Sequence, residues 1–398
     1  MKRLLVVLIL LTVACGGSPA QSRGSPTAGA TASPAANPSP PPPFPSPTPG
    51  GPTPPSPLAI VCTSQIPAGH QLALVTLHGV SGIVVRDVTD IAHPVSRCGL
   101  SGGAYLRFIS STRISYIVTA SGDQGAAGAL YMVDLSTSTT SLVRAWSTGG
   151  YASWVYAWSS DGQKLSYLSS DSAGIKWHLL SAAGDKTLSS LGTVPARGVS
   201  LDNDDAMVGF SADGQYVAVE ETFTTQKGAA TGAPPIQIVR LSDGKLVYSR
   251  ADGTMGAWGA TGARFYFRTT AGVQVWEATG KVQSVSAGLQ WIRPWPSSDG
   301  NHIAFTSLNA QGNHQVGIID TSIGNIAVAS TEPRTNPGFL TSTLVWYAGE
   351  TRCTTTTPCG FGGPALTGST YLYDIAGVES GSIDTAFYDS WPHNAGQS

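Results

Sequence analysis

A short pattern that recurs along the chain constrains its fold more than any other feature. The pattern starts with a large aromatic residue, continues through a polar Asp-Gly turn and ends in a strand that alternates apolar and polar residues. Asp-Gly between two such runs favours a β-hairpin, because glycine tolerates positive φ and aspartate can bond its own backbone. The clear copies are residues 158–167, 210–219 and 295–305, and weaker copies start at Phe108, Trp258 and Phe339.

The spacing of these copies indicates a radial array of small sheets. They lie roughly 40–50 residues apart, which is a period typical of propeller repeats. Each copy is followed by a second strand with apolar alternation and, in most units, by a short last strand. A unit of four antiparallel strands is the blade of a β-propeller.

The two ends of the repeat region predict how the ring closes. Residues 71–76, 82–87 and 94–97 have the pattern of the second, third and fourth strands of a further unit, whose innermost strand is missing. Residues 385–393 resemble the start of a repeat with nothing after it. Because a closed ring leaves no exposed sheet edge, we predict an all-β propeller of seven four-stranded blades closed by the C-terminal strand. Six or eight blades are the alternatives.

The repeats resemble those of a known family. The pattern Trp/Phe-Ser-x-Asp-Gly-x-x-Leu-Ala-Tyr is similar to the WD40-like (PD40-type) repeats of TolB-type propellers and extends over about residues 100–350. Residues 85–95 resemble a different extracytoplasmic propeller repeat. The proline usual before Asp-Gly is replaced here by Ser160 and Ala212. The resemblance implies a propeller in an extracytoplasmic setting, and a protein-binding scaffold role by analogy alone.

The N-terminus predicts export and a lipid anchor. Lys2 and Arg3 precede an apolar run over residues 4–13, which is too short to span a bilayer and has the form of a secretory signal. The small residue before Cys15 makes this segment resemble a bacterial lipobox. We therefore predict a lipoprotein signal peptide over residues 1–14, with Cys15 lipid-modified, for example by palmitate, and anchored to the cell membrane. An ordinary cleaved signal is the alternative.

A tether is predicted between this anchor and the propeller. Residues 15–58 consist mostly of Pro, Ser, Gly, Ala and Thr, and Arg23 is their only charged residue. Such a segment has no apolar set to bury, and its prolines favour an extended spacer. The propeller domain therefore takes residues 59–398, and we expect a monomer.

The cysteines predict disulfides. Apart from Cys15, the chain has Cys62, Cys98, Cys353 and Cys359, an even number in an exported protein. We favour Cys62–Cys98, which would tie the entering chain to the outer strand of the first blade, and Cys353–Cys359, which would close a threonine-rich loop. Other pairings and a zinc site are alternatives, although the spacings are not those of paired Cys-x-x-Cys ligands. We expect no metal and no cofactor.

Some aromatic residues are candidates for ligand binding. Tyr151, Trp154 and Trp291 lie outside the aromatic position of the repeat, near the expected beginnings of blades, and could stack on a ligand such as a wall sugar. Packing between blades is expected instead for the tryptophans assigned to the repeat's own aromatic position, which are Trp158, Trp258 and Trp295.

Composition and motifs narrow the function further. Charged residues make up 12% of the chain, the net charge is −2, and no basic run occurs, so no nucleic-acid partner is expected. No Gly-x-Ser-x-Gly nucleophile motif is present, and no catalytic residue is assigned. We expect a membrane-anchored binding or scaffold module for a protein or cell-envelope polymer, and not an enzyme. The alternative is a propeller lyase or glycosidase that uses carboxylates at the channel mouth on an envelope polymer.

Overall fold

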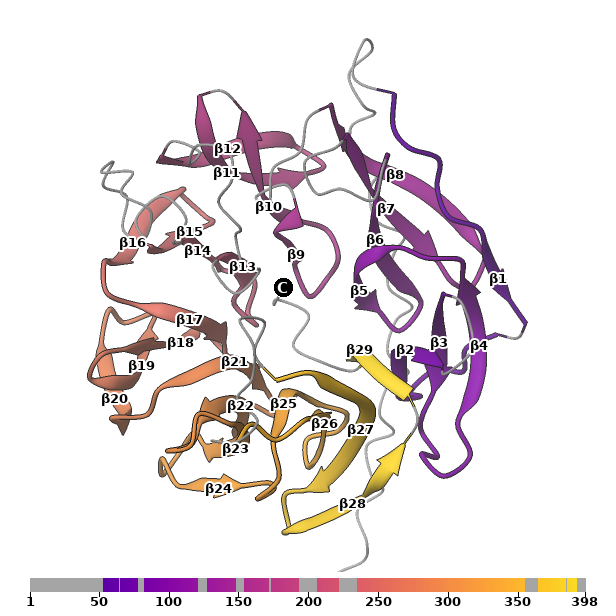
Figure 1. The fold of residues 1–398 in the computed structure, drawn as a ribbon. Coiled ribbons are helices and arrows are strands. Elements are labelled where there is room, and N and C mark those ends of the chain that lie inside the picture. The colour runs from indigo at the N-terminus through magenta and orange to yellow at the C-terminus, as the bar shows by residue number, and fades with distance from the viewer. Residues whose placement is uncertain are drawn as a thin grey trace, which may run out of the picture. The chain divides into compact units, whose positions relative to one another are not determined.

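The computed structural model describes residues 53–63, 65–77, 82–120, 127–147, 154–171, 173–192, 206–221, 235–354, 364–383 and 385–391. The chain divides into two units, Met1–Pro40 and Pro41–Ser398, and all the described residues belong to the second unit. Within this unit the strands form seven antiparallel sheets, arranged as blades around a common axis (Figure 1). The predicted all-β propeller with seven blades is thus confirmed. In the described residues, no helix has the length and apolar character needed to cross a membrane.

Six of the blades are consecutive four-stranded sheets in chain order. Blade 2 consists of β5 (Ala104–Ser110), β6 (Arg113–Thr119), β7 (Gly128–Asp134) and β8 (Thr139–Trp146). Blade 3 consists of β9 (Tyr156–Trp158), β10 (Leu165–Asp171), β11 (Gly174–Ser181) and β12 (Gly184–Gly192). Blade 4 consists of β13 (Ala206–Phe210), β14 (Tyr216–Glu221), β15 (Ile236–Arg240) and β16 (Lys245–Arg250).

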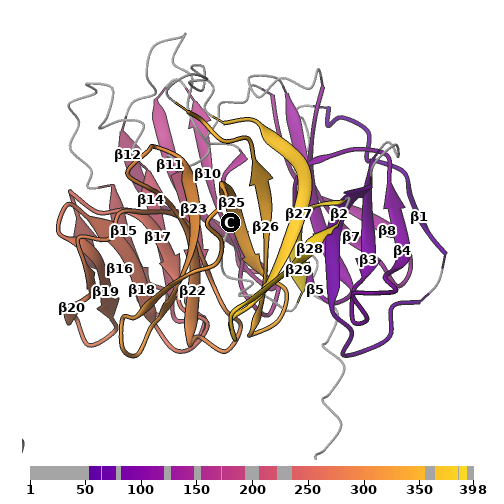
Figure 2. The same ribbon diagram turned by 60° about the horizontal axis from the view of Figure 1, so that its bottom comes forward.

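Blades 5, 6 and 7 have the same order of four consecutive strands. Figure 2 shows from the side how their strands run between the two faces of the ring. Blade 5 consists of β17 (Thr254–Trp258), β18 (Arg264–Thr269), β19 (Gly272–Glu277) and β20 (Val282–Ala287). Blade 6 consists of β21 (Trp291–Pro296), β22 (His302–Leu308), β23 (His314–Asp320) and β24 (Ile326–Val328). Blade 7 consists of β25 (Arg334–Phe339), β26 (Leu344–Glu350), β27 (Leu366–Asp374) and β28 (Val378–Ile383).

Blade 1 joins the two ends of the propeller. Its strand order is β1-β4-β3-β2-β29 (Figure 1). The C-terminal strand β29 is therefore the innermost strand of this blade, which was missing from the N-terminal repeat unit. Leu72 of β2 lies opposite Trp391 of β29, and Leu77 lies opposite Thr385. The predicted closure by the C-terminal strand is confirmed, and β1 adds a fifth, outermost strand that was not predicted. The bounds are β1 (Ile60–Cys62), β2 (Leu72–Leu77), β3 (Ile83–Asp87), β4 (Val95–Leu100) and β29 (Thr385–Trp391).

The recurring Ser-x-Asp-Gly segment forms the turn between the first and second strands of a blade. In blade 4, Ser211 Oγ donates to Asp213 Oδ1 at 2.6 Å and accepts from the Tyr216 backbone N–H at 2.9 Å. The same aspartate oxygen accepts from the Gln215 N–H at 3.0 Å, and Gly214 has a φ of +65°. The aspartate is therefore committed to the turn. Equivalent bonds occur at Ser159, Asp161 and Lys164 in blade 3 and at Ser297, Asp299 and His302 in blade 6.

The aromatic position of the repeat needs one correction. In each blade, one residue of the innermost strand pairs with the beginning of the second strand, and in blades 3 and 5 this residue is Trp158 or Trp258, both buried. In blade 6 it is Pro296, so the assignment of Trp295 to this position was wrong by one residue. Trp295 is half-buried and packs edge-on against Trp346, with ring centroids 5.9 Å apart. The pairs are Trp158–Leu165, Trp258–Phe265 and Pro296–Ile303.

The hydrophobic core consists of layers between neighbouring blades. Between blades 4 and 5, for example, Met207 and Ile238 pack with Trp258, Phe265 and Trp276. Burying one large apolar side chain contributes about 1.5–3 kcal/mol, so these layers hold adjacent blades together.

Candidate functional site

The innermost strands carry a recurring backbone irregularity. Tyr105 of β5, Met255 of β17, Arg293 of β21 and Asn336 of β25 have φ values of +52°, +53°, +50° and +51°. Residues other than glycine seldom adopt this left-handed conformation. Each of the four lies where the pairing with the second strand shifts register, which defines a β-bulge. Bulges redirect side chains, and strained residues are concentrated at functional sites.

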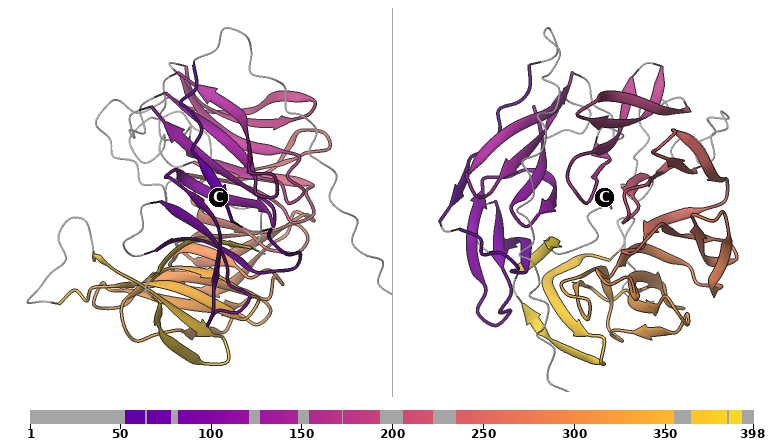
Figure 3. Two further views of the ribbon diagram at one scale, coloured as in Figure 1. Left: turned by 90° about the vertical axis from the view of Figure 1, so that its right-hand side faces the viewer. Right: turned by 180° about the vertical axis from the view of Figure 1, so that it is seen from behind.

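These four residues, which we call the inner-wall residues, share one level of the propeller. Their strands are the ones nearest the common axis, as the view from behind in Figure 3 shows. Each is partly exposed, whereas the aromatic or proline residue three positions later is buried in every case. The innermost strands of blades 2, 5, 6 and 7 therefore carry one tyrosine, one methionine, one arginine and one asparagine at equivalent, partly exposed positions, and Tyr105 and Met255 also pack against the core between blades.

A buried carboxylate holds the bulge at Met255. The backbone N–H groups of Met255 and Gly256 donate to the two oxygens of Glu220, each at 2.8 Å. Glu220 belongs to β14 of the preceding blade and is 2% exposed. From the following blade, the indole N–H of Trp291 donates to the Met255 carbonyl at 3.0 Å. These bonds come from the preceding and the following blade, so the bulge is fixed from both sides.

The bulge at Tyr105 is held by blade 3. The hydroxyl of Tyr156 donates to the Tyr105 carbonyl at 2.5 Å, and Trp154 packs edge-on against the Tyr105 ring at 4.8 Å. Burial raises the pKa of Tyr156 far above its ordinary value, so its hydroxyl keeps the proton that it donates. The position of the Tyr105 backbone is therefore set by contacts between blades.

Arg293 and Asn336 form a polar pair between blades 6 and 7. Arg293 Nη1 donates to Asn336 Oδ1 and, at 3.4 Å, to the hydroxyl of Thr335. Both members of the pair are inner-wall residues and both are half-buried. A guanidinium next to an amide suits the carboxylate and carbonyl groups of a peptide or polysaccharide acid.

Of the three residues that the sequence suggested for ligand binding, two are buried and one lies outside the described residues. Trp291 has 0% exposure, bonds Met255 through its indole and packs with Phe305, so it acts as a packing residue between blades. Trp154 is 7% exposed and supports Tyr105. Tyr151 lies outside the described residues.

The sequence did not reveal the inner-wall residues. For two of them, the residue that follows favours a different backbone conformation from the one observed. Arg293 precedes Pro294 and Asn336 precedes Pro337. A residue before proline ordinarily has an extended backbone with negative φ. The side-chain bonds from Arg293 to Thr335 and Asn336 accompany the observed conformation, and they join residues 42 and 43 positions apart in the chain.

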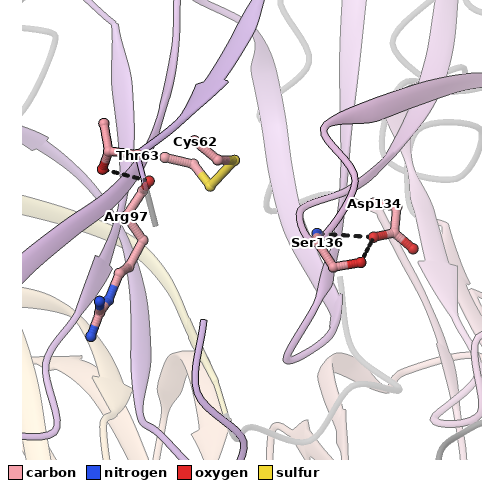
Figure 4. The surroundings of a disulfide bond; sticks show 6 residues. Cys62, Thr63, Arg97, Asp134 and Ser136 are labelled. Carbon is pink, nitrogen blue, oxygen red and sulfur yellow. Dashed lines mark hydrogen bonds between the residues drawn. A yellow bond between two sulfur atoms is a disulfide. The ribbon is translucent and has the colours of Figure 1, made fainter. Parts of the chain in front are cut away.

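One predicted disulfide is confirmed. Cys62 and Cys98 lie directly opposite each other in the β1–β4 pair and are bonded to each other. Figure 4 shows the bond and, beside it, Thr63, whose backbone N–H and hydroxyl both donate to the Arg97 carbonyl at 2.9 and 3.3 Å. These bonds continue the pairing one residue beyond β1.

The other site predictions lie partly beyond the described residues. Cys359 is not among them, so the pair Cys353–Cys359 stays a prediction; the Cys353 backbone is held by the side chain of Asn313. The lipidation site Cys15 is also outside the described ranges. Within those ranges, no group of three or more His, Cys, Asp or Glu residues is placed to hold a metal ion.

Comparisons with known proteins place these observations in context. No protein-family model matches the chain, and no curated protein matches its sequence. Similar solved structures include TolB from Acinetobacter baumannii, with 14% identity, a TM-score of 0.43, and coverage of 80% of this chain and 67% of that one. They also include the propeller domain of the Trilobed protease from Pyrococcus furiosus, with 10% identity, a TM-score of 0.46, and coverage of 70% and 82%.

An oligogalacturonate lyase in complex with manganese is similar to the same degree. It has 12% identity and a TM-score of 0.46, and the match covers 79% of this chain and 85% of that one. Proteins of the TolB type, which the repeats resemble, are thus among the similar structures. At these identities and TM-scores the likeness carries no argument about function, and the seven-bladed architecture rests on the strand pairing itself.

Proposed function

We propose that this chain is a lipid-anchored extracytoplasmic propeller that acts as a binding or scaffold module for a protein or cell-envelope partner. The observation that carries this proposal is the set of inner-wall residues, Tyr105, Met255, Arg293 and Asn336, on equivalent bulges. Neighbouring blades fix the bulges at Tyr105 and Met255 by hydrogen bonds. A display of side chains on rigid backbone lowers the entropy lost on binding, which favours recognition.

The chemistry of the inner wall suits a macromolecular segment. Tyrosine and arginine are enriched among the residues that dominate binding energies, and methionine adapts to irregular apolar surfaces. In this site Tyr105 and Met255 supply apolar contact area, while Arg293 and Asn336 supply polar groups. The combination supports binding of a peptide segment or an acidic polymer chain.

The carboxylates bonded to the innermost strands favour binding over catalysis. Glu220 accepts two backbone N–H groups of blade 5, and Asp389 of β29 accepts the Phe108 N–H at 2.7 Å. Both are buried, with 2% and 0% exposure. A glycosidase needs two carboxylates that converge on the sugar, and these two serve the backbone.

Besides the predicted signal peptide, one structural feature supports an extracytoplasmic location. Disulfides form and persist in oxidising compartments, and the Cys62–Cys98 bond joins strands β1 and β4. Anchoring through Cys15 can be tested by fractionating cells that express Cys15→Ala. We expect the variant to leave the membrane fraction, and retention there would disprove the lipid anchor.

Binding at the inner wall can be tested by photo-crosslinking in intact cells. A photoreactive residue at position 105 is compared with one at position 328, because Val328 is 55% exposed on the outermost strand of blade 6. We expect one partner to be captured from position 105 and lost in the Arg293→Ala, Asn336→Ala double variant. The matched control Arg352→Ala removes an exposed arginine outside the inner wall and should leave capture unchanged. Equal capture from position 328, or capture that survives the double variant, would disprove the assignment.

A further inference from the structure

A cavity lies at the seam where blade 1 meets blade 7. Its volume is about 200 Å³, and its apolar wall includes Val75, Val88 and Phe387 from the core layer between these blades. Ile91 from the β3–β4 connection and Ile383 from the end of β28 complete this apolar lining. The cavity is therefore built from both ends of the propeller, since β2, β3 and β29 meet β28 there.

Arg86 of β3 also lines the cavity and is the one charged residue among its described lining residues. The side chain is half-buried, and its Nε–H is buried with no hydrogen-bond partner. Buried polar groups are nearly always satisfied in native proteins, so an exception calls for a physical explanation.

The neighbouring acid does not neutralise this arginine. Asp87 follows Arg86 along β3, and successive side chains of a strand point to opposite faces of the sheet. The Asp87 carboxylate accepts hydrogen bonds from Arg97 at 2.6 Å, from His70 at 2.7 Å and from Thr89 at 2.9 Å. Its oxygens are committed to the other face, and no ion pair within the described part of the chain involves Arg86, which lies beside apolar walls.

We propose that this seam cavity binds a small organic anion, a carboxylate joined to an apolar ring or short chain, with the carboxylate on Arg86. A guanidinium forms strong, directional hydrogen bonds to a carboxylate, and the apolar walls accept the rest of the molecule. The size fits a single ring, because an apolar cavity of about 150 Å³ already holds benzene. The proposal does not depend on the function proposed for the inner wall.

Such an anion could come from a free small acid or from the C-terminus of a peptide that ends in an apolar residue. The two sources share the chemistry that the cavity recognises. Phenylacetate serves as the probe for the first source, and acetyl-Gly-Phe with a free carboxylate serves for the second. Phenylacetamide and the peptide amide are the matched neutral controls.

The test measures binding of these probes to the full chain by calorimetry or NMR. We expect phenylacetate to bind about tenfold more tightly than phenylacetamide, as for one charge-assisted hydrogen-bond pair. Arg86→Met keeps an apolar stem and should abolish this preference for the acid. Arg352→Met, which changes an exposed arginine elsewhere, should leave the preference unchanged.

A second variant keeps the test decisive if Arg86→Met does not fold. Ile91→Phe fills the cavity from a surface connection, retains Arg86 and should weaken binding of acid and amide alike. Tighter binding of the peptide acid than of phenylacetate would identify a chain end as the source, and the reverse order a free acid. Equal binding of acid and amide to the wild type, or binding unaffected by Ile91→Phe, would overturn the proposal.

Discussion

Cys62 and Cys98 face each other across strands β1 and β4, and their disulfide links the outermost strand of blade 1 to its neighbour (Figure 4). The two cysteines are 36 residues apart in sequence. A crosslink over that separation restricts the unfolded chain and contributes about 3–4 kcal/mol in the chain-entropy account.

We therefore predict that the double variant Cys62→Ser, Cys98→Ser has a free energy of unfolding about 3 kcal/mol below that of the wild type. Urea denaturation with and without a reductant measures this. In the presence of the reductant the wild type should be no more stable than the variant, because the Cys62–Cys98 bond is then absent from both. The ring should still close in the variant, because β29 pairs with β2 and not with β1.

Asp389 contributes to ring closure from the opposite end of the chain. Its Oδ2 atom accepts the Phe108 N–H of blade 2 at 2.7 Å, while the next residue, Ser390, donates to the Phe339 carbonyl of blade 7 at 2.7 Å. Adjacent residues of β29 thus bond both neighbouring blades. Both are fully buried, so the bonds are shielded from water.

We expect Asp389→Ala to lower the free energy of unfolding by about 2–4 kcal/mol, because the buried Phe108 N–H loses its acceptor and a cavity remains. Asp374→Ala is the matched control, since Asp374 is exposed and bonds only a turn N–H. Its loss should stay below about 1 kcal/mol. Equal losses in the two variants, measured by urea denaturation, would show that Asp389 does not stabilise closure.

The sequence was sufficient to predict the ring because the relevant signals are local. Ser211 and Asp213 form their turn with residues at most five positions away, so the motif predicts the hairpin wherever it occurs. Closure of the ring could be predicted because the first repeat unit lacks its innermost strand and the C-terminal segment has the pattern of that strand alone. Trp295 was misplaced because Pro296 is inserted into the motif, and only the strand register reveals which residue faces which partner.

The candidate sites could not be predicted in the same way. The backbone of Met255 depends on Glu220, and the cavity beside Arg86 depends on Phe387. The first pair joins two neighbouring blades, and the second joins the two ends of the propeller within blade 1. Neither pair is encoded by a periodicity or a local propensity. The proline after Asn336 even favours the conformation that the structure does not have.

The glycine of the repeated turn provides a further prediction. Gly214 has a φ of +65°, and an added Cβ would meet no atom within 4 Å, so backbone conformation alone determines the effect of a substitution. We predict that Gly214→Ala costs about 1 kcal/mol. Gly381→Ala is the matched control, because its Cβ would also meet nothing within 4 Å and its φ lies outside the left-handed region. Thermal or urea unfolding should show a loss only for Gly214→Ala.

The surroundings of Asp87 allow a prediction of how the free energy of unfolding changes in acid. Its side chain is 6% exposed, and this burial opposes ionisation. Hydrogen bonds from Arg97, His70 and Thr89 outweigh that effect and hold the pKa of the carboxyl well below its usual range. A carboxyl with a lowered folded-state pKa stabilises the protein above its unfolded pKa, and this contribution is lost as the pH falls through the folded pKa.

We therefore expect the contribution of Asp87 to be complete above about pH 4, near the ordinary pKa of aspartate, and to decline below it. Asp87→Asn should lower the free energy of unfolding at neutral pH by about 3 kcal/mol, because Arg97 loses a buried partner, and should flatten the decline in acid. Asp374→Asn, at an exposed position, should retain the acid slope of the wild type. Urea titrations at a series of pH values measure both effects, and an unchanged slope in Asp87→Asn would assign the acid sensitivity to other carboxyls.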